Sequence, residues 1–216
     1  MILRLPFAGL LGLAFFCMPA SANEPVIGGP CEGCEAVYQG MPENLASSAR
    51  IAPTGERGEP LRVTGLVTGR DGRPRAGVVV YAYQTDAKGI YPPPEKSLGR
   101  WPDRHGRLRG WVVTDERGRY TFDTIRPGSY PSRVAPEHIH MHVIEPGCGT
   151  YYIDEIVFSD DELLPASTRT SQDKARAGAG LTTPVREGGT WKITRDIRLG
   201  LNIPGYPARC AAPPTH

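Results

Sequence analysis

From residue 61 onward, short hydrophobic runs are separated by turns rich in glycine and proline. Between Tyr120 and Ile125, tyrosine, phenylalanine and isoleucine alternate with polar residues, which is the period of a half-buried strand. Strands are predicted in this way at 61–68, 78–84, 111–114, 120–125, 138–144, 151–158 and 191–199. No stretch keeps a helical period over more than a few turns. The pattern therefore predicts an all-β protein, a β-sandwich of mainly antiparallel short strands.

The chain divides into four stretches of different character. Residues 1–22 have the pattern of a secretory signal peptide, with Arg4, an apolar run at 5–18 and a small-residue cleavage site ending at Ala22. We therefore predict cleavage near Ala22 and export to the periplasm or the extracellular space. Residues 23–58 form an irregular arm with at most a short helical turn near 43–48. Residues 59–200 form the sandwich, and residues 201–216 are a tail.

Composition limits the partners of the chain. Of its 216 residues, 39% are hydrophobic, which is enough for one domain with its own core. The net charge is +2, and the apolar run at 5–18 is too short to span a bilayer, so neither nucleic acid nor a membrane is indicated as a partner. Two long segments, 89–109 and 165–189, are loops that a rigid sandwich would use for binding. The sequence leaves the oligomeric state open.

Four cysteines remain once Cys17 is removed with the signal peptide, and an even number in an exported chain favours disulfides. They are Cys31, Cys34, Cys148 and Cys210. Three pairings are possible, and the sequence does not choose among them. The Cys31–Cys34 C-x-x-C spacing also suits a redox or zinc motif. It lacks a second C-x-x-C and a neighbouring histidine pair, so structural disulfides are the preferred interpretation.

Three histidines stand at strand spacing in Glu137-His138-Ile139-His140-Met141-His142. Side chains at i and i+2 point to one face of a strand, so His138 and His140 can share a metal ion. An exposed histidine face, or one buried histidine with a backbone partner, is the alternative.

Two tyrosines, Tyr91 and Tyr130, stand in turn regions near the predicted strands. Tyrosine is more often a packing residue than a ligand. As a phenolate it needs a hard, strong Lewis acid, a description that fits ferric iron better than the softer divalent ions.

These residues resemble the signature of the intradiol ring-cleavage dioxygenases, the family of protocatechuate and catechol dioxygenases. The resemblance rests on segments 83–91, 114–122, 124–131 and 136–140, and it covers about half of the chain. It implies one Fe(3+) ion held by Tyr91, Tyr130, His138 and His140, with Tyr130 as the tyrosinate that the substrate displaces. It also implies that a catechol-type aromatic compound and O2 are the substrates, and that the product is a cis,cis-muconate. The loops 89–109 and 165–189 would then be active-site loops.

Two positions depart from the family pattern. The family has an arginine three residues before the first histidine, where this chain has Ala135. Arg133 is the predicted catalytic replacement, and Arg126 is the alternative. The family often has a glutamine where Glu155 falls. His142 is an extra histidine, which we interpret as a pocket wall or structural residue.

Two other functions remain open. The pattern at 67–78 is also similar to carboxypeptidase-regulatory-like and adhesin sandwich modules, which would make the chain a non-enzymatic binding module. Those modules lack the two tyrosines and the H-x-H pair. A degenerate dioxygenase that keeps iron without cleaving rings is the third possibility, because of Ala135 and Glu155. Iron uptake and oxygen consumption separate the three.

Overall fold

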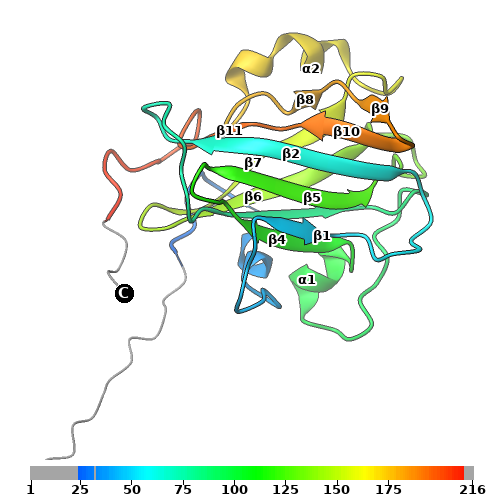
Figure 1. Ribbon diagram of the computed structural model, residues 1–216, viewed down its shortest axis with the longest axis horizontal. Coiled ribbons are helices and arrows are strands. Elements are labelled where there is room, and N and C mark those ends of the chain that lie inside the picture. Colours follow the sequence, from blue (N-terminus) through cyan, green and yellow to red (C-terminus); the bar gives the residue numbers. More distant parts are fainter. Residues whose placement is uncertain (1–23, 32, 212–216) are drawn as a thin grey trace, which may run out of the picture.

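The computed structural model describes residues 24–31 and 33–211 (Figure 1). The predicted signal peptide and Cys17 lie outside these residues. In chain order the elements are η1 (Cys34–Val37), β1 (Ser48–Arg50), β2 (Pro60–Thr68), β3 (Val79–Gln84), α1 (Arg100–His105), β4 (Arg109–Val113), β5 (Arg119–Ile125), β6 (His138–Glu145), β7 (Gly149–Phe158), α2 (Ala166–Thr170), η2 (Gln172–Lys174), β8 (Leu181–Thr182), β9 (Val185–Glu187), β10 (Thr190–Thr194) and β11 (Ile197–Arg198). Within the described part of the chain, no helix is long and apolar enough to cross a bilayer.

Two sheets form a sandwich, which confirms the predicted fold class. One sheet has the order β1-β5-β2-β10-β9, with β11 also paired to β2, and the other has the order β4-β3-β6-β7-β8. The long pairings, β2 with β5, β3 with β6 and β6 with β7, are antiparallel. Parallel pairings involve the short strands β1, β8, β10 and β11. Figure 1 shows α1 and α2 at opposite edges of the sandwich.

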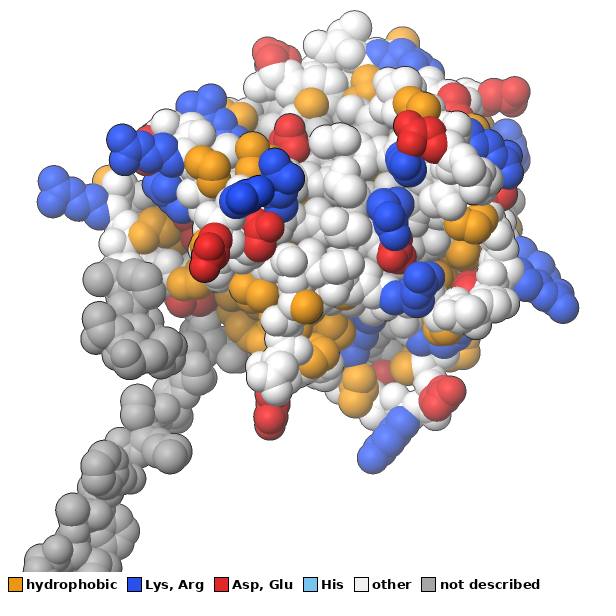
Figure 2. Space-filling model, in the orientation of Figure 1, with side chains coloured by type: hydrophobic (Ala, Val, Ile, Leu, Met, Phe, Trp, Pro, Cys, Tyr) orange, Lys and Arg blue, Asp and Glu red, His pale blue; other side chains and the backbone are white. Residues whose placement is uncertain are grey.

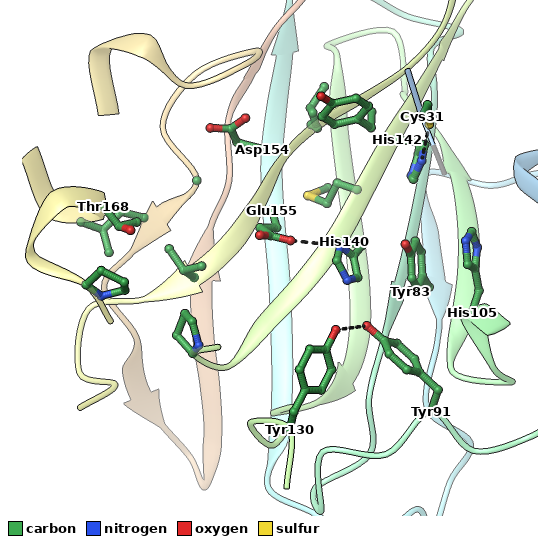
Figure 3. Close-up of a pocket in the computed structure, with 18 of the residues that line it drawn as sticks. Cys31, Tyr83, Tyr91, His105, Tyr130, His140, His142, Asp154, Glu155 and Thr168 are labelled. Carbon is green, nitrogen blue, oxygen red and sulfur yellow. Dashed lines mark hydrogen bonds and ion pairs between the residues drawn. The ribbon is translucent and has the colours of Figure 1, made fainter. Parts of the chain in front are cut away.

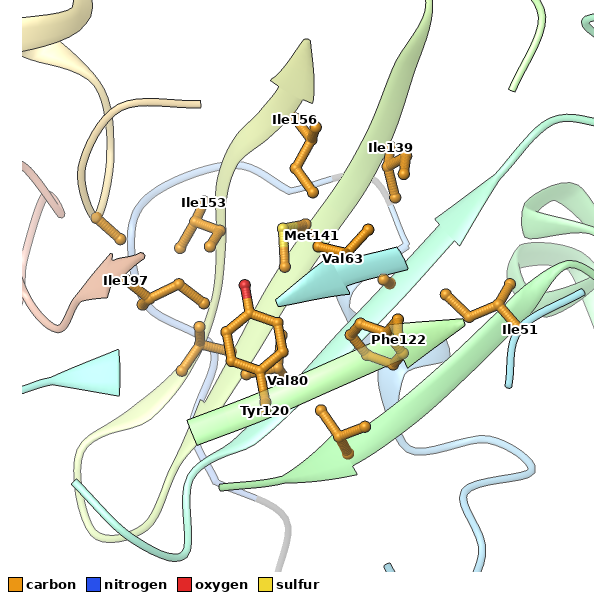
Figure 4. Close-up of a cluster of buried hydrophobic side chains, with 14 of the residues drawn as sticks. Ile51, Val63, Val80, Tyr120, Phe122, Ile139, Met141, Ile153, Ile156 and Ile197 are labelled. Atoms are coloured by element: carbon orange, nitrogen blue, oxygen red, sulfur yellow. The ribbon is translucent and has the colours of Figure 1, made fainter. Parts of the chain in front are cut away.

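The core lies between the two sheets and is built by alternation along the strands (Figure 4). Tyr120 and Phe122 of β5 are buried from one side, and Ile139 and Met141 of β6 from the other. The Tyr120 hydroxyl donates to the Arg195 carbonyl at 2.6 Å, so its one polar atom is satisfied inside the core. Because the alternate residues of β6 face this core, the histidines between them face the opposite side of the sheet.

The outer face of the second sheet is also covered. Trp111 of β4 and Tyr81 of β3 form a second cluster with Val37 of η1, and the Trp111 indole donates to the Val37 carbonyl at 2.6 Å. The N-terminal arm is therefore packed onto the same sheet face that carries the histidines. The arm therefore shelters part of the outer sheet face beside β6.

The structure differs from the expected elements in three places. No helical turn forms at 43–48, because the carbonyls of Ala46 and Ser47 accept bonds from β4 and β5 and residues 48–50 pair with β5. The predicted strand at 191–199 is interrupted at Arg195-Asp196, between β10 and β11. The two long loops contain short elements, namely α1 in the first and α2, η2, β8 and β9 in the second.

The surface carries charges of both signs in close alternation. Figure 2 shows lysine or arginine side chains beside aspartate or glutamate over much of one face. An example is the ladder of the first sheet, where Arg62 contacts Asp123 at 2.8 Å. This distribution agrees with the small net charge and gives no single-sign patch on that face.

Candidate metal centre

Four side chains converge at one end of β6, and they are the four predicted ligands. The Tyr91 and Tyr130 hydroxyls are 2.9 Å apart, and the Tyr130 hydroxyl is 3.0 Å from Nε2 of His138. Nε2 of His138 is in turn 3.1 Å from Nε2 of His140. Two phenolic oxygens and two imidazole nitrogens therefore form one continuous chain of donor atoms. The structure brings all four residues together, although they come from three separate segments.

Close backbone contact between two turns places the tyrosines side by side. Gly89 has φ +78°, and a Cβ there would lie 1.8 Å from the Ser129 carbonyl oxygen. A Cβ on Gly128 would lie 2.6 Å from the Ala87 carbonyl oxygen. Only glycine fits such contacts, and Gly89 also needs the left-handed backbone. These two glycines let the loop before Tyr91 lie directly against the turn before Tyr130.

A β-bulge in the β6–β7 pair shapes the other side of the centre. Ile139 pairs with Ile156, whereas Met141 pairs with Ile153, so the ladder register shifts at His140. One residue on β6 is thus matched by Asp154 and Glu155 on β7. Ile153 and Ile156 both stay in the core, and both acidic residues line the pocket. Bulges often re-aim side chains in this way beside functional sites.

Hydrogen bonds at the far nitrogens fix the orientation of both imidazoles. Nδ1 of His138 lies 2.7 Å from the Pro136 carbonyl oxygen, and Nδ1 of His140 lies 3.0 Å from a carboxylate oxygen of Glu155. Because both partners are acceptors, each Nδ1 carries the hydrogen and each Nε2 offers a lone pair. Two nitrogen lone pairs 3.1 Å apart repel each other unless a cation or a proton lies between them. The donor set therefore fits a metal ion.

Electrostatics around the tyrosines favour a strong Lewis acid. Burial and the neighbouring Tyr130 hydroxyl raise the pKa of Tyr91 far above its usual range. Burial also lowers the pKa of His138, which keeps its imidazole neutral and able to act as a ligand. A buried phenol with this environment loses its proton only to a strongly charged cation. Hard oxygen donors of this kind match ferric iron.

The carboxylate of Glu155 is ionised in this setting. Burial has the largest single effect and would raise its pKa, but the hydrogen bond from His140 and the electrostatic attraction of His140 and His138 together outweigh burial, and the pKa lies below its usual range. The sequence marks the Glu155 position as a departure from the family pattern. It does not indicate the contact with His140, because the bulge that produces this contact has no sequence signal.

A stack of aromatic rings supports His140 from the side of β3. The Tyr83 ring lies 3.7 Å from the His105 ring at an interplanar angle of 4°, and 4.6 Å from the His140 ring at 22°. The Tyr81 hydroxyl lies 2.9 Å from Nδ1 of His105. Sequence reasoning did not single out Tyr83 or His105. The β propensity around Tyr83 predicted a strand, but only the pairing of Tyr83 with His140 reveals the stack.

The four side chains open onto a cavity of about 770 Å³, drawn in Figure 3. Among the residues that line it are Trp101 and Arg104 from α1, Tyr152 from β7, and Thr168 and Gln172 from the second long loop. Both long loops therefore reach the cavity, as expected of binding loops on a sandwich.

The predicted replacement arginines lie elsewhere. Arg133 is exposed, with φ 52°, and is not among the residues that line the cavity. The Arg126 guanidinium is bound by Glu137 at 2.7 Å and by Asp160 at 2.8 Å, which gives it a structural role. Among the described residues that line the cavity, Arg104 is the one arginine or lysine. The catalytic role of Arg133 stays a prediction.

The cysteines pair as Cys31–Cys34 and Cys148–Cys210, one of the three possible pairings. The first disulfide lies at the wall of the same cavity, which Cys31 and His142 both line. The second lies beside Tyr206.

Comparisons with known proteins find dioxygenases. A family model described as dioxygenase matches residues 37–183. Over 148 residues the chain is 33% identical to the 6-chlorohydroxyquinol 1,2-dioxygenase of Cupriavidus pinatubonensis, a match that covers 61% of this chain and 49% of that protein. It is 28% identical over 226 residues to the hydroxyquinol 1,2-dioxygenase of a Rhizobium species, covering 89% and 72%. The chain thus spans about half the length of the first of these relatives.

Solved structures share the fold. The dioxygenase domain of a carbohydrate-binding fusion protein from Streptomyces sp. SirexAA-E superimposes with a TM-score of 0.53 at 24% identity, over 74% of this chain and 91% of that one. The catechol 1,2-dioxygenase of Acinetobacter radioresistens gives a TM-score of 0.55 at 19% identity, over 89% and 69%. At this level of identity the likeness concerns the sandwich itself.

Proposed function

The chain belongs to the intradiol ring-cleavage dioxygenase family, and on that basis we propose that it cleaves a catechol-type ring with ferric iron and O2. The expected product is a cis,cis-muconate-type dicarboxylate. The observation that carries the proposal is the convergence of two phenolic oxygens and two Nε2 atoms at steps of 2.9, 3.0 and 3.1 Å. A structural cluster of tyrosine and histidine would not need both histidines to present free lone pairs to each other.

Tyr91, Tyr130, His138 and His140 would hold the iron. When bound, ferric iron would supply a Lewis acid and a template that orients the substrate. The hydrogen bonds from His138 to Pro136 and from His140 to Glu155 hold the two imidazoles in place for this task. The Lewis acid would also allow the buried Tyr91 to exist as a phenolate.

Tyr130 is the proposed proton acceptor. Its hydroxyl lies between the Tyr91 hydroxyl and Nε2 of His138, and its side chain lines the cavity. With ferric iron held beside it, Tyr130 would be a phenolate, and its oxygen could then take and hold the proton of a substrate hydroxyl that enters at this point. Such proton transfer by a positioned side chain typically contributes about 10²–10⁴-fold to the rate.

The ring itself would lie in the cavity. Its volume of about 770 Å³ is of the size of small-molecule sites, and Trp101 and Tyr152 offer aromatic surface for a flat substrate. Arg133 remains the proposed substitute for the family arginine on sequence grounds, and Arg104 is the candidate by position. Either would offset negative charge that develops on the ring.

We also propose that the protein is exported, as residues 1–22 predict. The two disulfides support this proposal, because such bonds persist in oxidising compartments.

The test uses iron-loaded protein with catechol, hydroxyquinol and protocatechuate under air. We expect oxygen uptake equal to the ring-opened dicarboxylate formed for at least one of the three. Tyr130→Phe should remove most of the rate, whereas Tyr152→Phe, a cavity tyrosine outside the four, should keep it. Iron binding without oxygen uptake across the panel would favour the degenerate iron-binding protein. Failure to bind iron would contradict both.

A further inference from the structure

The Cys31–Cys34 disulfide lies beside a histidine that the iron centre does not use. Sγ of Cys31 is 3.7 Å from Nε2 of His142, and one donor atom from each of Cys31, Cys34 and His142 lies within 4.8 Å of the others. Figure 3 shows Cys31 and His142 at the end of the cavity away from Tyr91 and Tyr130. Cys34 and His142 are buried, and Cys31 is half-buried on the cavity wall.

His142 is poorly satisfied for a buried polar side chain. It is 3% exposed, and its Nδ1 has no hydrogen-bond partner among the described residues. The contact of its Nε2 is with the Cys31 sulfur, which in the disulfide is only a weak acceptor. Buried polar atoms without partners are rare and often mark a functional group. The Nε2 atom of His142 is aimed at the two sulfurs, so its lone pair can serve a metal ion that binds both of them.

The chemistry of the three groups differs from that of the iron centre. Two cysteine sulfurs and one imidazole are soft or borderline donors, which select zinc, cadmium or cuprous ions over ferric iron. The C-x-x-C spacing is a common way to present two thiolates to one metal ion. A site with three protein ligands keeps a further position free, and Cys31 and His142 both face the cavity.

The sequence alone could not reveal this group. The C-x-x-C motif has no neighbouring histidine along the chain, because His142 is 111 residues from Cys31. The strand β6 supplies His142, and packing of the N-terminal arm against the same sheet face supplies the cysteines. The fold therefore completes a motif that is incomplete in the sequence.

We propose that the reduced form of Cys31 and Cys34, together with His142, binds one thiophilic metal ion in the wall of the cavity. A dithiol reductant donates two electrons and two protons to the Cys31–Cys34 bond, which gives two thiols while the reductant becomes a disulfide. Metal binding then displaces both thiol protons to solvent, and Nε2 of His142 adds its lone pair. The oxidised form offers no thiolate, so metal binding is switched by the redox state of the pair. This proposal does not depend on the iron centre.

The second disulfide of the chain offers a matched control. Cys148 and Cys210 lie beside Glu145 and the Tyr206 hydroxyl, with a carboxylate where the first pair has an imidazole. Reduction of the whole protein opens both pairs. The proposal therefore requires that high-affinity binding of the metal ion depends on Cys31, Cys34 and His142 and not on the second pair.

The experiment titrates Cd²⁺ into the full-length protein after reduction with a dithiol and its anaerobic removal. Thiolate-to-cadmium charge transfer in the ultraviolet reports sulfur ligation, and it is silent for a metal bound only by tyrosine and histidine. We expect one high-affinity Cd²⁺ per reduced chain and no such band in the oxidised protein. His142→Asn should weaken binding by at least about tenfold. The Cys31→Ser/Cys34→Ser double variant should abolish the band.

The control variant Cys148→Ser/Cys210→Ser should keep the band and the affinity. Because His142→Asn leaves Cys31, Cys34, Cys148 and Cys210 in place, circular dichroism on that variant separates lost ligation from lost folding. Equal affinity in folded His142→Asn and the unaltered protein would overturn the proposal. So would loss of the band in the Cys148→Ser/Cys210→Ser variant, or absence of any charge-transfer band after reduction.

Discussion

Replacing Glu155 by glutamine tests how the chain holds one of its ligands. The carboxylate of Glu155 is 3.0 Å from Nδ1 of His140 and makes a charged hydrogen bond to the imidazole of this proposed ligand. Glutamine has nearly the same shape and can still accept a hydrogen bond, so the substitution removes mainly the negative charge. Loss of such an outer partner typically weakens metal binding by about 10–100-fold, or about 1.4–2.8 kcal/mol.

The geometry places the effect at the weaker end of that range. The Glu155 side chain is 47% exposed and that of His140 is 27% exposed, so solvent screens part of the interaction. We therefore expect Glu155→Gln to weaken iron binding by about tenfold. Iron with a less basic histidine is a stronger Lewis acid, so the tyrosinate-to-iron absorption band should also move to lower energy.

The assay is competition for iron against a chelator at fixed pH, followed by the visible spectrum of the loaded protein. Asp154→Asn is the matched control, because Asp154 lines the same cavity from the neighbouring position on β7. We expect this control to retain affinity and band position. Unchanged affinity and an unshifted band in Glu155→Gln, or an equal effect of Asp154→Asn, would refute the reasoning.

Three further outcomes follow from the structure. Gly89→Ala should lower iron affinity in the same chelator assay, because its Cβ would lie 1.8 Å from the Ser129 carbonyl oxygen and force the two tyrosine loops apart. Unchanged iron affinity in this variant would show that the contact is not required. Burial lowers the pKa of His105 to about 3, whereas the same histidine in the unfolded chain is protonated near pH 6.5. The free energy of unfolding therefore falls as the pH drops from about 6.5 towards 3. The free energy of unfolding of the metal-free protein should thus fall by about 2 kcal/mol between pH 7 and pH 5 because of His105. Urea denaturation should show that this contribution is absent in His105→Gln. Steady-state oxygen uptake should fall more in Arg104→Ala than in Arg133→Ala if position in the cavity decides, and the reverse order would support the sequence-based choice of Arg133.

Local patterns made much of the fold predictable. The alternation at 120–125 indicates β5, and the spacing of His138, His140 and His142 is enough to place three histidines on one face of β6. These features depend on the strand period of two, which is a property of neighbouring residues. The four proposed ligands could be named for the same reason, together with the family resemblance, and the structure brings these four residues together.

Features that depend on pairing between distant segments were not predictable. The bulge that brings Glu155 to His140 arises from the register between β6 and β7. The stack of Tyr83 on His140 needs the register between β3 and β6. The turn expected at 43–48 does not form because backbone pairing with β4 and β5 outweighs local preference. Sequence spacing contains no information on these contacts.

The most direct test of the central claim is a spectroscopic titration of the metal-free protein with ferric iron. We expect one iron per chain and a visible tyrosinate-to-iron absorption band, which should weaken markedly in Tyr91→Phe and in Tyr130→Phe and persist in Tyr152→Phe. A colourless protein at full iron loading, or a band of unchanged position and strength in both Tyr91→Phe and Tyr130→Phe, would contradict the four-residue iron centre.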